Sequence, residues 1–123
     1  MEISTVQVDL IYGYTMEEQK EALMCMVDNG EIIEKLEEKM AQAYLSRDLY
    51  RLKELLDRKM AICSSPEETA AMLDNRNADW LTKMPGIMKE KPTLFAVGAG
   101  HLLGEKGVLK LLRDVGYVVE AVK

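Results

Sequence analysis

The sequence predicts an α/β fold that is mostly helical, with a helical region over 1–91 followed by a parallel β-α-β unit over 92–123. Two observations predict this fold class. Apolar residues recur at helical spacing through the first two thirds of the chain. After Pro92 the period changes, and two short apolar runs flank an amphipathic stretch, which is the order of a right-handed β-α-β crossover.

The length of 123 residues predicts one domain over 1–123, and the formal charge of −5 leaves no basic face for nucleic acid. No apolar run reaches the ~18–20 residues of a membrane span, and no basic start followed by an apolar stretch marks a signal peptide. We therefore expect neither a nucleic-acid partner nor a membrane segment in this chain, and its compartment stays open. Cys25 and Cys63 lack metal-ligand spacing and are interpreted as small apolar helix residues, not as a disulfide framework.

Caps and stops divide the helical region. An apolar face in "EISTVQVDLIYG" favours a helix that stops at Gly13, although its Val and Ile content also fits a strand. In "TMEE", Thr15 and Glu18 form a capping box for a helix that stops at Asn29–Gly30. Two further helical patterns follow, separated by a bend near Ser46–Asp48.

The clearest cap is "SSPEE", in which Ser65 caps the helix, Pro66 takes its first position and Glu68 closes the box. The helix that begins there runs toward "DNRNADWLTKM", and Pro85–Gly86 is expected to interrupt it.

The C-terminal stretch contains the predicted β-α-β unit. "TLFAVGA" is typical of a buried strand, "EKGVLKLLRDV" of a helix that stops at Gly116, and "YVVEAV" of a second strand. Two parallel strands do not make a finished sheet, because such strands are normally covered on both faces and flanked by others. We therefore expect the chain to be a fragment of a larger domain, or to pair its incomplete sheet with a second copy in a homodimer.

His101 is the only histidine and follows the first predicted strand directly, in a loop with Gly98, Gly100, Gly104 and Gly107. Ligands of open α/β sheets bind beyond the carboxyl ends of strands, and an imidazole there can be a metal ligand or a general base. The alternative is a loop histidine that hydrogen-bonds to backbone. A phosphate-binding loop is disfavoured, because "GAGHLLG" is one residue longer than the dinucleotide fingerprint and its bulky side chains would crowd a pyrophosphate.

A second polar cluster is "DNRNADW". Arg76 offers a planar fork for a carboxylate or an oxyanion, and Asn77 both donates and accepts hydrogen bonds. An exposed helix corner is the alternative for this pair, and Trp80 is expected in the core. A metal site needs three or four ligands, and no spacing singles out a set among the available carboxylates, which are Glu2, Asp74, Asp79 and Glu105.

Several stretches together resemble the TraB/PrgY/GumN family of metal-dependent hydrolases, which includes TIKI-type proteases. "VQVDLIYGYTMEEQKEAL" looks like its Q-rich helical stretch, "AYLSRDLYRLKEL" is similar to its Y-x-x-x-D-L segment, and "NRNADWLTKM" to its E-R-N-x-x-W element. The most specific match is "FAVGAGHLLGEKGVLKLLRDVGYVVEAV", which contains a G-x-x-H motif. The resemblance covers nearly the whole chain, but only the C-terminal half of the family.

The resemblance implies a partial erythromycin-esterase-like fold and two G-x-x-H histidines that meet at a divalent metal. Carried over by position, His101 is a metal ligand or catalytic residue, Gly98 is its motif partner, and Arg76 and Asn77 belong to the site. Asn75 stands where the family usually has glutamate, and Glu2 matches a family glutamate only weakly. The first G-x-x-H motif is absent from this chain.

Two functions follow as hypotheses. In the first, the chain is the C-terminal part of a TraB/GumN-type metal-dependent hydrolase of peptide or ester bonds, inactive alone and completed by its missing N-terminal half. In the second, it is a non-catalytic helical oligomerisation or binding module whose partner is a second copy or another protein.

Overall fold

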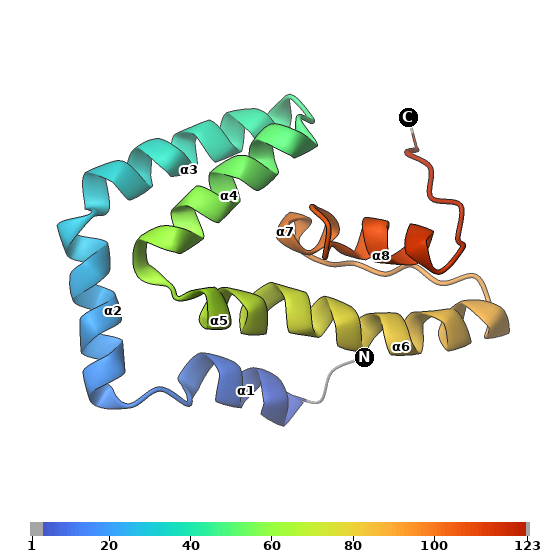
Figure 1. Cartoon of the computed structure of the whole chain (residues 1–123), viewed down its shortest axis with the longest axis horizontal. Coiled ribbons are helices and arrows are strands. Elements are labelled where there is room, and N and C mark those ends of the chain that lie inside the picture. The colour runs from blue at the N-terminus through green and yellow to red at the C-terminus, as the bar shows by residue number, and fades with distance from the viewer. Residues whose placement is uncertain (1–3, 123) are drawn as a thin grey trace. The chain divides into compact units, whose positions relative to one another are not determined.

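The computed structural model describes residues 4–122, and all regular secondary structure in that range is helical (Figure 1). The chain divides into two compact units, here called the N-terminal unit, up to Thr69, and the C-terminal unit, from Ala70 onward. None of the described helices is both long and apolar enough to cross a membrane.

The N-terminal unit follows the predicted caps. Thr15 N donates to Glu18 Oε2 at 2.7 Å and Glu18 N to Thr15 Oγ1 at 3.3 Å, which confirms the first capping box. The reciprocal bonds of Ser65 and Glu68 confirm the second. The helices of this unit are α1 (Ser4–Tyr12), α2 (Met16–Asp28), α3 (Gly30–Leu45), α4 (Leu49–Cys63) and α5 (Pro66–Thr69).

Helices α3 and α4 lie side by side as a hairpin (Figure 1). Leu36 of α3 and the α4 residues Leu52 and Leu55 are buried, because the apolar positions recur every three or four residues on one face of each helix. Arg47, with a φ of 58°, lies in the turn between the helices, at the predicted bend.

A disulfide joins Cys25 of α2 to Cys63, the last residue of α4. The interpretation of both cysteines as small apolar helix residues is therefore wrong. Their separation of 38 residues carries no pattern, and only the folding of α2 against the end of α4 brings the two Cα atoms to 5.8 Å.

The C-terminal unit packs around Trp80, Met84 and Val108, with Met88 and Phe95 against them. Trp80 is thus in the core, as predicted. The expected interruption at Pro85 is wrong, since α6 continues through it to Glu90. Trp80, Met84 and Met88 recur every four residues on the buried face, and their packing offsets the backbone hydrogen bond that proline removes. The elements of this unit are η1 (Ala70–Asp74, π-helical), α6 (Asn75–Glu90), α7 (Ala99–Leu102) and α8 (Val108–Asp114).

The predicted parallel β-α-β unit over 92–123 is wrong, and so are the α/β class and the incomplete sheet that were expected from it. Within 92–122 no residue pairs in a sheet. Of the three predicted elements only the helix forms, as α8, and α7 is a helical turn that was not predicted. Phe95 and Val97 are partly buried, and their neighbours Leu94 and Ala96 are exposed. Side chains thus alternate between two faces as in a β-strand, although no hydrogen bonds pair this segment with a second strand. An isolated pair of strands is at best marginally stable, and the described chain supplies no further strand to flank it.

Candidate functional site

His101 lies in α7, a single turn that begins after Gly98. Its backbone N–H donates to Gly98 O at 3.0 Å, and its side chain is only 9% exposed. Gly100 is the second residue of this turn, and Gly104, with a φ of 79°, makes the sharp bend that follows it. Together these residues turn the histidine ring inward, toward α6.

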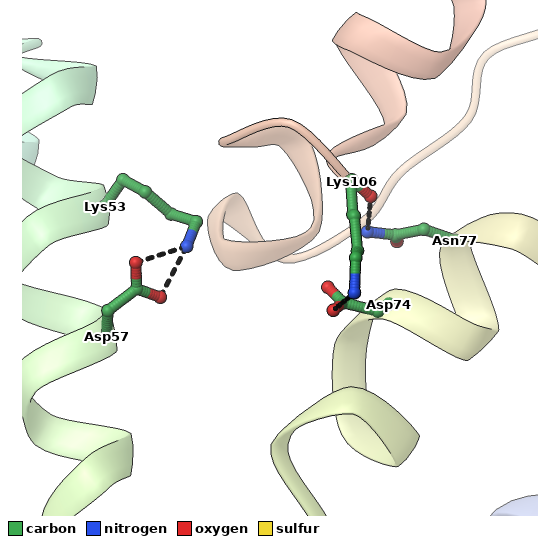
Figure 2. A network of polar contacts seen from close by, with 5 residues as sticks. All are labelled: Lys53, Asp57, Asp74, Asn77 and Lys106. Atoms are coloured by element: carbon green, nitrogen blue, oxygen red, sulfur yellow. Dashed lines mark hydrogen bonds and ion pairs between the residues drawn. The ribbon is translucent and has the colours of Figure 1, made fainter. Parts of the chain in front are cut away.

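Asn77 of α6 fixes the orientation of the His101 ring. Its Nδ2 donates to Lys106 O at 2.8 Å, an interaction drawn in Figure 2. The amide oxygen Oδ1 therefore faces His101 Nδ1, 2.8 Å away, and an oxygen can only accept there. The proton of the neutral ring is consequently on Nδ1, and the lone pair is on Nε2. Asn77 is 1% exposed, so water does not compete for these bonds.

Arg76 is adjacent to that lone pair. Its Nη1 lies 3.5 Å from His101 Nε2 and donates to Met72 O at 3.2 Å. Its guanidinium carbon lies 5.2 Å from the centre of the Trp80 ring, within cation–π range. The guanidinium is thus held beside Nε2 by contacts on two sides.

The ring of Trp80 packs against the ring of His101. Its ring centre lies 4.5 Å from that of His101, at an interplanar angle of 39°. Trp80 is 5% exposed, and its Nε1–H has no hydrogen-bond acceptor in the described part of the chain. Buried donors are nearly always paired, so this N–H is an exception in the core of the C-terminal unit.

The structure therefore brings together Arg76, Asn77 and His101, the three predicted site residues, from two segments that are 24 residues apart at their closest. It sets them on the Trp80 ring in one polar cluster, here called the His101 cluster. The exposed helix corner that was the alternative for Asn77 is wrong, because that side chain is buried.

Comparison with known families identifies the chain. The family model described as the TraB/PrgY/gumN family matches residues 2–121. The chain belongs to the TraB/PrgY/gumN family. Membership agrees with the resemblance found in the sequence motifs. No curated protein and no solved structure matches this TraB/PrgY/gumN chain.

The divalent metal that the resemblance implies does not fit the described residues by themselves. No group of three or more metal-ligating side chains gathers within them. Asp74 pairs with Lys106 at 3.0 Å (Figure 2), and Asp79 pairs with Lys83. Glu2 lies outside the described residues. A cation on His101 Nε2 would also meet the guanidinium charge of Arg76.

One feature of this site escaped the sequence motifs. Lys106 contributes a backbone carbonyl, which no residue pattern encodes. Among the four glycines of the predicted loop, the sequence did not show which one is required. Gly107 caps α8, and a Cβ there would lie 2.4 Å from Leu103 O, so only glycine fits. By contrast, a Cβ on the motif residue Gly98 would lie 4.0 Å from the nearest His101 atom, an ordinary contact.

Proposed function

We propose that this chain contributes one side of a hydrolytic site for peptide or ester bonds, and that a second polypeptide segment completes it. One observation carries the proposal. Asn77 holds the His101 ring in one tautomer, so that Nε2 presents its lone pair beside the guanidinium of Arg76. A proton acceptor and an oxyanion donor next to each other are the two groups that hydrolysis of an acyl bond needs.

In the proposed reaction, His101 Nε2 accepts a proton from water while the water oxygen attacks the carbonyl carbon. The carbonyl oxygen becomes an oxyanion, which accepts a hydrogen bond from Arg76. When the tetrahedral intermediate collapses, the bond to the leaving group breaks and Nε2–H returns its proton to that group. Asn77 acts as a positioning residue, since its Oδ1 stabilises the positive charge that the ring carries between the two transfers.

Metal dependence belongs to the complete protein in this proposal. The family resemblance calls for a divalent metal. His101 Nε2 would then be one of its ligands instead of the base, because its single lone pair cannot bind a metal and a proton together. The other two or three ligands would come from outside the described residues, and Arg76 would have to move away.

The test begins with the DNA immediately upstream of codon 1. We expect an in-frame segment that encodes a second G-x-x-H motif. The extended protein is then assayed on nitrophenyl esters and fluorogenic peptides, with and without divalent metal. His101→Ala and Arg76→Ala should each lower kcat/KM by about a hundredfold or more. Arg58→Ala, at an exposed ion pair in α4, is the matched control and should keep full activity.

Two results would contradict the hydrolase. One is the absence of any upstream segment with such a motif. The other is an extended protein in which His101→Ala changes neither hydrolysis nor metal titration.

A second candidate function is supported by a separate observation. Five apolar residues of α2 are half or more exposed: Met16, Leu23, Met24, Met26 and Val27. Soluble monomers rarely leave a continuous apolar helix face open. We propose as the alternative that the chain is a non-catalytic module whose α2 packs on α2 of a second copy. Light scattering tests it, since Leu23→Glu should convert a dimer to a monomer, and a wild-type monomer would contradict it.

A further inference from the structure

The Cys25–Cys63 disulfide is the feature that neither proposed function uses. Both cysteines are only partly buried, so solvent reaches the disulfide. They line one open cavity of about 390 Å³ with Glu18, Glu21 and Glu68. Asn29 Nδ2 donates to Cys25 O at 2.9 Å and lies 3.6 Å from Cys25 Sγ. The disulfide thus lies at the surface, in a cavity that a small molecule can enter.

Apart from the disulfide, few buried contacts hold helix α2 on the rest of the N-terminal unit. None of its thirteen side chains is buried, whereas α3 and α4 bury Leu36, Ala43, Leu52 and Leu55 between them. Burial of apolar side chains is the main source of docking energy for a helix. The covalent bond from Cys25 to the last residue of α4 therefore replaces the core contacts that α2 lacks.

We propose that the Cys25–Cys63 disulfide is a thiol-exchangeable latch that determines whether α2 is docked on α4. A small thiol, as its thiolate, attacks one sulfur, the S–S bond breaks, and a mixed disulfide and one protein thiolate form. A second molecule of thiol attacks the mixed disulfide and leaves as the oxidised small disulfide. Two small thiols thus lose two electrons and two protons, and the chain gains two Cys–SH groups and an undocked α2.

The cavity sets which thiol reacts fastest. Glu18, Glu21 and Glu68 carry negative charge around the disulfide, and their field repels an anionic reductant. Both reductants attack as thiolates, but the glutathione thiolate carries a net charge of about −2 and the 2-mercaptoethanol thiolate about −1. We expect 2-mercaptoethanol to reduce the disulfide faster than glutathione when the two are compared at equal thiolate concentration. Added salt screens the charge of the carboxylates and should therefore bring the two reduction rates closer together. Glu21→Gln is the variant that removes one of these charges without disturbing a helix cap, because Glu18 and Glu68 also close capping boxes.

The decisive experiment is hydrogen exchange on the full chain, oxidised and then reduced with dithiothreitol. Amides of α2 should exchange at least about tenfold faster after reduction and approach the rate of an unfolded helix, whereas amides of the α3–α4 hairpin should remain protected. Alkylation should find no thiol before reduction and two after it. The double variant Cys25→Ser, Cys63→Ser should exchange like the reduced chain and ignore dithiothreitol.

Either of two results overturns the latch. One is unchanged exchange in α2 although both thiols have been alkylated. The other is a chain whose two cysteines are thiols after oxidation by a small disulfide. Both are measured on the wild-type chain, so they hold even where the double variant fails to fold. Equal rates with the two reductants at low salt would overturn the role of the carboxylates.

Discussion

Asn77 is the residue on which the geometry of the His101 cluster depends. It is buried and makes one hydrogen bond to His101 Nδ1 and one to Lys106 O. Asn77→Ala would remove both hydrogen bonds, and a buried group that loses its partner costs about 1–3 kcal/mol. We expect the free energy of unfolding to fall by about 2–4 kcal/mol, measured by urea denaturation.

Gln19 offers a matched control, since its side chain also donates to a backbone carbonyl but is exposed. Gln19→Ala should change stability by less than about 0.5 kcal/mol. Equal effects of the Asn77 and Gln19 substitutions would show that the buried network does not contribute.

Alanine substitutions at two glycines should change the stability of the chain in opposite directions. A Cβ at Gly107 would lie 2.4 Å from Leu103 O, which is backbone and cannot move aside. At Gly86, inside α6, a Cβ meets nothing within 4 Å. We expect Gly107→Ala to lower the thermal midpoint, and Gly86→Ala to stabilise the chain by about 0.5–1 kcal/mol through helix propensity. Calorimetry of both variants checks the signs, and a stabilising Gly107→Ala would contradict the structure.

At this scale the sequence predicts side chains better than backbone groups. Arg76, Asn77 and His101 could be chosen because each has a distinctive chemistry in a short motif. Their mutual contacts depend on how α7 packs against α6, which no local spacing encodes. The Lys106 carbonyl could not be chosen at all, because every residue has one.

Among the elements, α2 gives a prediction for pH. The hydrogen bond from the Thr15 backbone, followed by that from its side chain, lowers the pKa of Glu18 below its usual value. A carboxylate with a lowered folded pKa stabilises the fold above the unfolded value of about 4.3, and that contribution is lost as pH falls through the folded value. We expect α2 to fray as pH falls below the unfolded value of about 4.3. Hydrogen exchange of residues 16–20 against pH measures this.

Glu18→Gln separates this effect from general acid unfolding. The glutamine keeps a side-chain acceptor for Thr15 N but does not titrate, so the pH dependence of α2 exchange should disappear. A variant with the wild-type pH profile would show that other carboxylates are responsible.

Caps were predictable because they are local. Thr15 with Glu18, and Ser65 with Glu68, lie three residues apart, and each pair satisfies backbone groups of its own helix. Strands are different, since the hydrogen bonds that define a β-strand need a second strand that is distant in the sequence. The apolar run around Phe95 predicts a buried strand, but the described chain offers no second strand to pair with it. Pro85 shows the converse, because tertiary packing keeps α6 helical where its local preference would stop it.

For the whole molecule, the disulfide shows what composition cannot predict. Two cysteines in helical patterns favour an apolar interpretation, because no spacing between them indicates a disulfide. Whether a disulfide forms depends on whether α2 folds back against α4, and the α3–α4 hairpin determines this. The mostly helical class was predictable from periodicity, but the covalent link between α2 and α4 was not.

The disulfide makes the last prediction, on how the chain unfolds. It closes a loop of 38 residues that lies wholly within the N-terminal unit. In the chain-entropy model such a loop contributes about 4 kcal/mol of stability. Reduction should therefore lower the midpoint of helix loss, measured by circular dichroism in urea. Trp80 is the only tryptophan and lies in the core of the C-terminal unit, so its fluorescence should change at nearly the same urea concentration in both redox states. Equal shifts of the two transitions would show instead that both units unfold together.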